Sequence, residues 1–169
     1  MELNDLLIDL FGRISENVHA AVDGLATAAL SEPIAPQTNP IGWLVWHLTR
    51  VQDDHIADVL DAEQVWISGD WPPRFGVTAD PDNTGYGHSW DDVLTIRPAD
   101  ASALAGYYDA VAARTHQFLE RLSLGELHRI VDDGWDPPVT LAVRLVSIAD
   151  DNIQHAGQAV YARGVLGRR

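Results

Sequence analysis

The chain has 169 residues, 46% of them hydrophobic, which predicts one globular domain over residues 1–169. Its 25 acidic and 11 basic side chains give a formal charge of −14, which repels phosphate groups and argues against a nucleic-acid or membrane partner. Cysteine is absent, so disulfides, thiolate metal ligands and a cysteine nucleophile are excluded, and any thiol must come from a substrate. With no basic leader and no apolar run of roughly 20 residues, a soluble cytoplasmic protein is expected.

Two helices are predicted in the first third of the chain. Apolar residues recur every three or four positions over residues 2–29, the spacing of a helix with one apolar stripe. His19 projects roughly opposite this stripe, so we expect it to be solvated. The stretch SEPIAPQTNP ends this helix, and its last residues, Asn39 and Pro40, are a typical N-cap and first helical residue. A second helix is predicted over residues 40–61.

A long connection separates the second helix from the third. Residues 63–99 are rich in proline, glycine and tryptophan, too aromatic for a disordered linker, with one helical turn in SWDDVLTI. Asp100 is expected to cap a third helix that runs to Leu122, and Thr140 to cap the last helix after a turn-rich link. Four long helices without a convincing strand pair predict an all-α four-helix bundle, in which the long crossover allows the second and third helices to run parallel.

The last predicted helix carries polar side chains in the middle of an apolar seam, within the sequence DNIQHAG. Asp151 and His155 lie one turn apart, and residues at i and i+4 are neighbours on a helix surface. Burying them without partners would be strongly unfavourable, so each needs a partner. A second apolar line beside this seam, which includes Val146 and Ile153, predicts that the helix is buried on much of its circumference.

The second helix offers that partner. His47 lies at one edge of its apolar stripe, and opposite Asp151 and His155 it would complete a three-ligand N/N/O set, the pattern of catalytic zinc sites that keep an open position. His55 is a poor fourth ligand, because eight residues along a helix separate it from His47 by about 12 Å, so we assign it to structure or to support of the ligands. Asn152 is assigned a role in catalysis, orienting a ligand or hydrogen-bonding a metal-binding group.

Other interpretations stay open on the residues alone. The same three ligands would suit a metal-dependent hydrolase that uses metal-bound hydroxide, and two histidines with one carboxylate would also suit non-haem iron. Alternatively, Asp151, Asn152 and His155 would form a metal-free polar network in a non-enzymatic, stress-related binding or dimerisation module.

Two segments carry a resemblance to a known family. GWLVWHLTRVQDDH in the second helix and DDNIQHAGQAVYARG in the last resemble the DinB-like (YfiT-like) metalloenzymes, in particular the actinobacterial branch related to mycothiol-dependent enzymes. The resemblance implies a four-helix bundle with up-down-down-up topology, often dimeric, that holds a divalent metal, typically zinc or nickel, on three side chains. The family's ligand positions match His47, Asp151 and His155. Many members have histidine where this sequence has Asp151, and the mycothiol-dependent isomerases have glutamate there.

The residues and the resemblance together predict a divalent-metal-dependent enzyme that activates a low-molecular-weight thiol, a mycothiol-type S-transferase. The ion, zinc or nickel, would lower the pKa of the bound thiol and so supply a nucleophile at neutral pH. A small-molecule electrophile is expected among the aromatic residues of positions 66–90. A homodimer is also expected, because the resemblance implies one.

Overall fold

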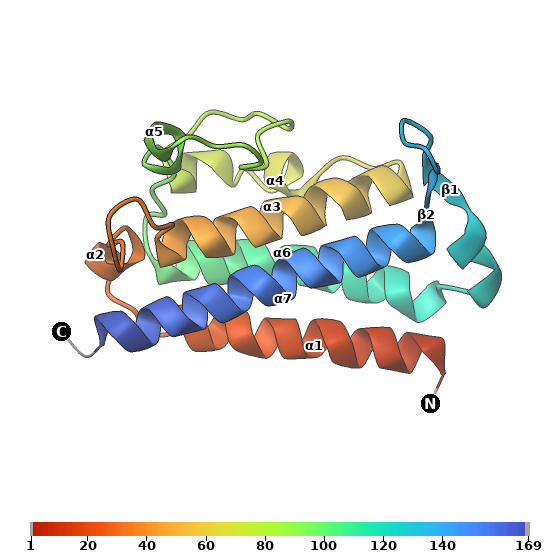
Figure 1. Ribbon diagram of the computed structural model, residues 1–169, viewed down its shortest axis with the longest axis horizontal. Helices are drawn as coiled ribbons and strands as arrows, with labels where there is room; N and C mark the ends of the chain where they lie inside the picture. Colours follow the sequence, from red (N-terminus) through yellow and green to blue (C-terminus); the bar gives the residue numbers. More distant parts are fainter. Residues whose placement is uncertain (1, 168–169) are drawn as a thin grey trace.

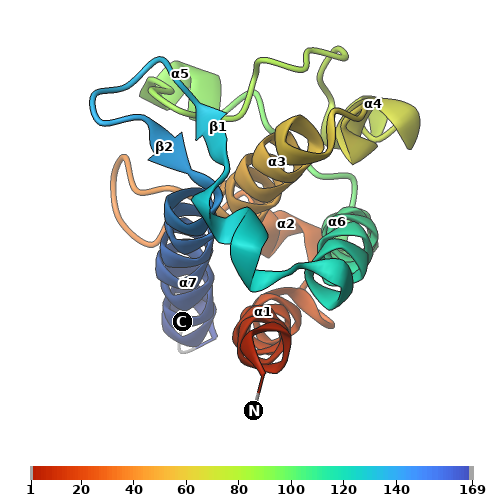
Figure 2. The same ribbon diagram turned by 90° about the vertical axis from the view of Figure 1, so that its right-hand side faces the viewer.

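The computed structural model describes residues 2–167 and consists mainly of helix. Its long helices are α1 (Leu3–Val22), α3 (Ile41–Leu60), α6 (Ala101–Arg121) and α7 (Leu141–Leu166). They form a bundle in which α1 and α7 run in one direction and α3 and α6 in the other (Figure 1). Seen end-on, α3 lies diagonally opposite α1, and α7 lies diagonally opposite α6 (Figure 2). The expected all-α bundle is confirmed in this coarse form.

Short elements fill the connections between the long helices. The long connection from α3 to α6 contains a helical turn at the expected SWDDVLTI sequence. In chain order, the short helical elements of all the connections are α2 (Thr27–Leu30), α4 (Val65–Ser68), η1 (Pro72–Phe75), α5 (Trp90–Val93) and η2 (Leu124–His128). The prediction of one helix over residues 2–29 is wrong at its end, because Gly24 adopts a φ of 69° that a continuing helix does not allow.

A small hairpin corrects the expectation that the chain has no strand pair. β1 (Ile130–Asp132) pairs antiparallel with β2 (Val139–Thr140), directly before α7. Strands of two and three residues are too short for an alternating pattern of apolar and polar residues to be visible in the sequence. The sequence therefore predicts a turn-rich link here but does not reveal that two of its segments pair as strands.

The predicted caps of the third and last long helices are confirmed. The side chain of Asp100 accepts a hydrogen bond from the Ala103 amide at 2.8 Å, and Thr140 accepts one from the Val143 amide at 3.3 Å. The predicted burial of α7 around much of its circumference is wrong, however. Val146 is 68% exposed and Ile153 is 44% exposed, because α7 occupies a corner of the bundle and one of its faces meets solvent.

A buried charged pair on α3 anchors the long connection. The guanidinium of Arg50, which has no exposed surface, donates to the carbonyls of Pro81 at 2.8 Å and Asn83 at 3.0 Å. Asp53, one turn further along, accepts hydrogen bonds from the amides of Val65 and Trp66 at 2.8 and 2.7 Å. The beginning and the middle of the connection are thereby held on α3, and Thr84, directly after the middle anchor, lies against His47.

No helix within residues 2–167 is long and apolar enough to cross a membrane. The cytoplasmic location and the single domain over residues 1–169 stay predictions.

Candidate metal centre

The three predicted ligands come together between α3 and α7. His47 of α3 and Asp151 and His155 of α7 each offer one ligand atom, and these atoms lie within 4.8 Å of one another. Asp151 Oδ1 is 3.8 Å from His47 Nε2 and 3.5 Å from His155 Nε2. The spacing of one helical turn places Asp151 and His155 side by side, and the antiparallel contact of α3 with α7 brings His47 opposite them.

Hydrogen bonds at the far side of each ring fix which nitrogen faces the cluster. The Nδ1 of His47 donates to the carbonyl oxygen of Thr84 at 2.7 Å, and the Nδ1 of His155 donates to Gln158 Oε1 at 3.0 Å. Since Nδ1 carries the proton in each neutral ring, each Nε2 keeps a lone pair directed at Asp151. Hydrogen bonds of this kind orient histidines that bind metals.

Aromatic rings and a close backbone contact hold His47 in place. The ring of Trp43 stacks on it with a centroid separation of 4.6 Å and an interplanar angle of 12°. Next to the Nδ1 atom of the ring lies Gly85, whose φ is 91°. A Cβ at this position would be 2.7 Å from His47 Nδ1 and 2.8 Å from the ring of Trp46, so only glycine allows the loop to approach this closely.

The two histidines differ in how the site affects their protonation. Burial lowers the pKa of His47, and the Thr84 hydrogen bond and the charge of Asp151 offset this only in part. Burial also acts to lower the pKa of His155, but the hydrogen bond and charge of Asp151 outweigh it, and the net shift is upward. The lowered pKa favours the neutral ring of His47, whereas the raised pKa of His155 means that a proton competes more strongly with a cation there.

The donor set fits a divalent cation. Two ligand atoms bound to one ion at about 2.1 Å with tetrahedral angles lie roughly 3.4 Å apart, close to the separations from Asp151 Oδ1 to the two Nε2 atoms. The second carboxylate oxygen, Asp151 Oδ2, is buried and has no hydrogen-bond partner among the described residues. A buried carboxylate oxygen without a partner is unfavourable, and a bound cation would stabilise it. The shorter aspartate side chain therefore still brings a carboxylate oxygen within reach of both histidines.

A cleft of about 260 Å³ opens beside the ligands along the groove between α3 and α7. Its lining beyond His47 and Asp151 comprises Val51, Asp54, His55, Thr84, Tyr86 and Ser147. His55 lies at the far end, where its Nε2 is 3.3 Å from the guanidinium of Arg144, which also pairs with Asp132 at 2.7 Å. The structure places His55 in this cleft but not in the ligand cluster, in agreement with its assignment away from the metal.

Asn152 does not join the cluster of ligand atoms. Its side chain is fully buried and its amide donates to Gln52 Oε1, on a different face of α3 from His47. One residue along a helix turns the side chain by about 100°, which directs Asn152 toward the bundle interior while Asp151 faces the cleft. The predicted role of Asn152 in orienting a ligand stays a prediction.

Three contributors to the site were not predicted. Thr84 and Gly85 lie in a loop whose path is set by Arg50, far from the ligands in sequence, so no local pattern points to them. Gln158 was within reach of sequence analysis. It follows His155 by three residues on the same helix, a spacing that brings two side chains together.

The fold and the site define the class of this protein, a DinB-like four-helix bundle with a His/Asp/His cluster between two of its helices. The mycothiol-S-transferase family model matches residues 6–167. The chain belongs to the mycothiol-S-transferase family, and the resemblance found in the sequence is confirmed.

A solved structure agrees with this fold over the full length of the chain. It is described as the crystal structure of a conserved protein from Enterococcus faecalis, and it is 28% identical to this chain. The TM-score is 0.90, and the match covers 100% of this chain and 99% of the other. Among proteins with curated descriptions, no significant match is found.

Proposed function

We propose that the protein is a divalent-metal-dependent mycothiol S-transferase whose metal ligands are His47, Asp151 and His155. The observation that carries the proposal is the convergence of these ligand atoms in a chain of the mycothiol-S-transferase family. Both histidine rings present Nε2 to the same point because Nδ1 is bonded elsewhere. Two imidazoles and one carboxylate leave at least one coordination position open, as catalytic centres require.

A divalent cation, zinc or nickel, supplies positive charge that lowers the pKa of a thiol bound beside it. The chain's own residues hold and orient that charge. Asp151 contributes the only negative charge among the three ligands, and Trp43 and Gly85 confine the ring of His47. The site therefore favours a thiolate at neutral pH without a cysteine of its own.

The transfer step uses the thiol of the cosubstrate as the nucleophile. The S–H proton leaves to solvent, sulfur forms a bond to an electrophilic carbon, and the leaving group departs with its electron pair. A cleft of about 260 Å³ suits the reacting end of the thiol and a small electrophile better than a complete large cosubstrate, whose remainder would extend beyond it.

The metal centre is tested first, by thermal unfolding of the chelated protein with added Zn²⁺ or Ni²⁺. A ligand that binds only the folded state raises the melting temperature with its concentration. We expect this rise in the wild type and in His116→Ala, and its loss in His155→Ala. His116 is a matched control because it also lies one turn from an acidic residue, Glu120, at 3.4 Å. Unchanged melting of the wild type would refute the metal centre.

Transferase activity is tested separately, by conjugation of mycothiol to a fluorogenic alkylating agent in the presence of the metal. We expect conjugation by the metal-loaded wild type and by His116→Ala, and a rate at background for His155→Ala. Metal binding without conjugation of any electrophile tested would keep the metal centre and refute the transferase. Turnover of an ester without added thiol would instead favour a hydrolase with the same ligands.

A further inference from the structure

The groove between α3 and α7 is hollowed on both sides of the candidate metal centre. The cleft of about 260 Å³ extends toward His55, and a second pocket, of about 290 Å³, is lined by Leu44 of α3 and Gln158 of α7. Because α3 and α7 run antiparallel, residues before His47 and residues after His155 lie at the same end of the groove. The second pocket, which we call the end pocket, therefore opens at the opposite end from the cleft.

The end pocket has a polar but uncharged lining. No charged side chain is among the described residues that line it, although 21% of the chain is charged. Its polar side chains are Gln37, Thr38, Asn39, Gln158 and Tyr161. Amides and hydroxyls of this kind both donate and accept hydrogen bonds, so they suit a neutral ligand that does the same.

Several amides of the end pocket have no role within the fold. The expectation that Asn39 caps α3 is wrong, because the N-cap is Pro40 and no side chain bonds to the first turn. The side-chain amides of Asn39 and Gln37 have no hydrogen-bond partner among the described residues. Gln158 uses its Oε1 to hold His155, which leaves its own N–H groups available. A ligand can therefore bond to these groups without breaking a bond of the fold.

An exposed aromatic ring stands beside these amides. Tyr161 follows Gln158 by three residues on α7, a spacing that places both side chains on one face of the helix. Its side chain is 67% exposed, so most of its surface is open to a ligand. An aromatic face can pack against the C–H face of a sugar ring, while the hydroxyl end remains polar.

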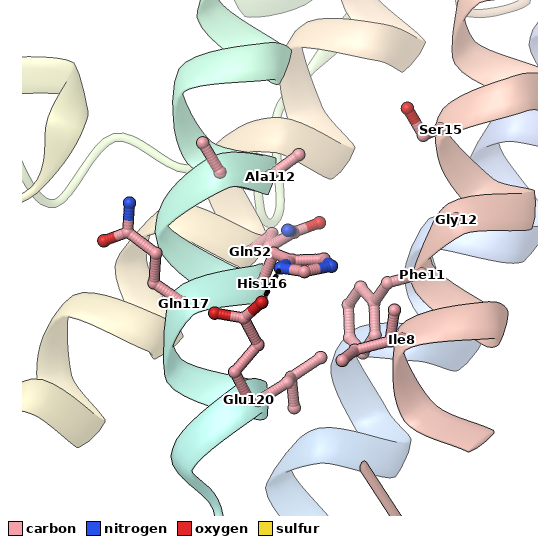
Figure 3. Close-up of a pocket in the computed structure, with 11 residues that line it drawn as sticks. Ile8, Phe11, Gly12, Ser15, Gln52, Ala112, His116, Gln117 and Glu120 are labelled. Atoms are coloured by element: carbon pink, nitrogen blue, oxygen red, sulfur yellow. Dashed lines mark ion pairs between the residues drawn. The ribbon is translucent and has the colours of Figure 1, made fainter. Parts of the chain in front are cut away.

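The largest crevice of the molecule differs from the end pocket. It has a volume of about 610 Å³ and lies between α1 and α6, where Phe11 and Ala112 are among its mainly apolar walls (Figure 3). Both polar atoms of Gln52, at its floor, are hydrogen-bonded within the bundle. Free hydrogen-bonding groups next to a metal ligand are therefore a feature of the end pocket.

A thiol transferase has to hold two substrates at one metal at the same time. Mycothiol carries its thiol on an acetylated cysteine, which an amide joins to a glucosamine ring and, through that ring, to inositol. The molecule is uncharged apart from its thiolate, and it is rich in hydroxyls. The cleft of about 260 Å³ is too small for these rings together with an electrophile.

The distances allow the rings to leave the metal in the other direction. About five covalent bonds, or roughly 6 Å, separate the sulfur of mycothiol from its first ring. Along α7, Gln158 lies about 4.5 Å and Tyr161 about 9 Å beyond His155. A sulfur atom at the metal would therefore place the rings in the end pocket, and the cleft would stay free for the electrophile.

We infer that the end pocket binds the hydroxyl-rich pseudodisaccharide of the thiol cosubstrate. Asn39, Gln37 and Gln158 provide its hydrogen bonds, and Tyr161 provides the surface on which a ring packs. The inference rests on the proposed transferase function, because it concerns the thiol of that reaction. It assigns the two ends of the groove to different substrates, the thiol to the end pocket and the electrophile to the cleft.

The kinetic test compares mycothiol with N-acetylcysteine, which has the same reacting end but no sugar, in conjugation to monobromobimane by the metal-loaded protein. Asn39→Ala and Tyr161→Ala should each raise KM for mycothiol about fivefold, the effect of one neutral contact, with kcat little changed. Neither should change KM for N-acetylcysteine. Gln154→Ala removes an amide on α7 that bonds to Asp150, and it should leave both thiols unaffected. Circular dichroism checks that each variant is folded.

A binding test needs neither metal nor turnover. S-methyl mycothiol has no free thiol, and calorimetric titration into the chelated protein measures its affinity for the chain alone. We expect it to bind the wild type and Gln154→Ala equally, and to bind Asn39→Ala and Tyr161→Ala about fivefold more weakly. N-acetyl-S-methylcysteine, which lacks the rings, should bind at least about tenfold more weakly than S-methyl mycothiol.

The outcomes separate this inference from the proposed function. Conjugation of mycothiol that both folded variants leave unchanged would keep the transferase and overturn the end pocket. A KM raised equally for both thiols would show that the variants act on the metal ligands instead of on the sugar. Selective loss in Tyr86→Ala, but not in Tyr161→Ala, would place the rings at the cleft. Binding of S-methyl mycothiol that the variants weaken, without any conjugation, would keep the end pocket and refute the transferase.

Discussion

The candidate metal centre depends on single hydrogen bonds that decide which nitrogen of each histidine is free. For His155 this bond comes from Gln158, on the same helix and one turn away. Without it the ring could rotate or present the other tautomer, and both changes remove the Nε2 lone pair from the cluster. The orientation of the His155 ring therefore depends on Gln158, which is not itself one of the three proposed metal ligands.

We predict that Gln158→Ala lowers the affinity for Zn²⁺ by about tenfold or more without unfolding the chain, because partners of metal-binding histidines have effects of this size. Calorimetric titration of the chelated protein measures the change. Gln154→Ala is the matched control, since Gln154 lies one turn earlier and its side chain donates to the exposed Asp150 at 2.9 Å. Equal affinity in both variants would mean that Gln158 has no part in holding the ring.

His19 shows how tertiary contacts change a residue that the sequence presents as solvated. Its side chain is still 34% exposed, in keeping with that expectation, but its Nε2 is 2.9 Å from Asp109 of α6 and its Nδ1 is 3.3 Å from Asp23. Burial acts to lower the pKa of His19, but the hydrogen bonds to Asp109 and Asp23 outweigh it, and the pKa is raised above 6.5. A raised pKa stabilises the folded chain fully below the unfolded pKa, and this contribution is lost as pH rises through the folded pKa.

His19→Gln is therefore expected to destabilise the chain at about pH 5.5 by up to about 1 kcal/mol, the usual size for an exposed pair, and by less at about pH 8.5. Urea unfolding of both proteins at the two pH values gives the difference in free energy of unfolding. A difference that grows with pH would have the wrong sign for the pair with Asp109 and would refute it.

Among the elements, the long connection between α3 and α6 decides the shape of the candidate centre. Arg50 binds its carbonyls at Pro81 and Asn83, and the next residues lie against His47. The positive φ of Gly85 and its lack of a side chain allow this contact. The loop that covers the site is thus held in place by the buried guanidinium of Arg50, which lies one turn after His47 on α3.

Gly85→Ala should lower both stability and metal affinity, because its Cβ would displace the ring of His47 or the loop. Gly87→Ala separates the two effects. Gly87 also has a positive φ, of 72°, but a Cβ there meets nothing within 4 Å. Both variants should lose about 1–2 kcal/mol from backbone strain, as measured by urea unfolding, and only Gly85→Ala should bind Zn²⁺ more weakly. Unchanged Zn²⁺ affinity in Gly85→Ala would show that the close approach does not constrain the ligand.

For the whole molecule, the helical bundle was predictable because its signals are local. The caps at Asp100 and Thr140 and the apolar spacing within each long helix act over a few residues, and the structure confirms them. The α7 surface was not predictable in the same way. Val146 and Ile153 have helical spacing like core residues, and only the corner position of α7 leaves them exposed. A homodimer stays a prediction.

The sequence by itself determined the four long helices, the pairing of Asp151 with His155 and the absence of a cysteine nucleophile, since each follows from residue identity or from neighbours within one helical turn. Only the tertiary structure decided that His47 lies 3.8 Å from Asp151, that Gly85 lies against its ring and that a crevice opens at Gln52. Those contacts join distant parts of the chain. They depend on how the helices pack and on where buried charges anchor the loops, which no local pattern records.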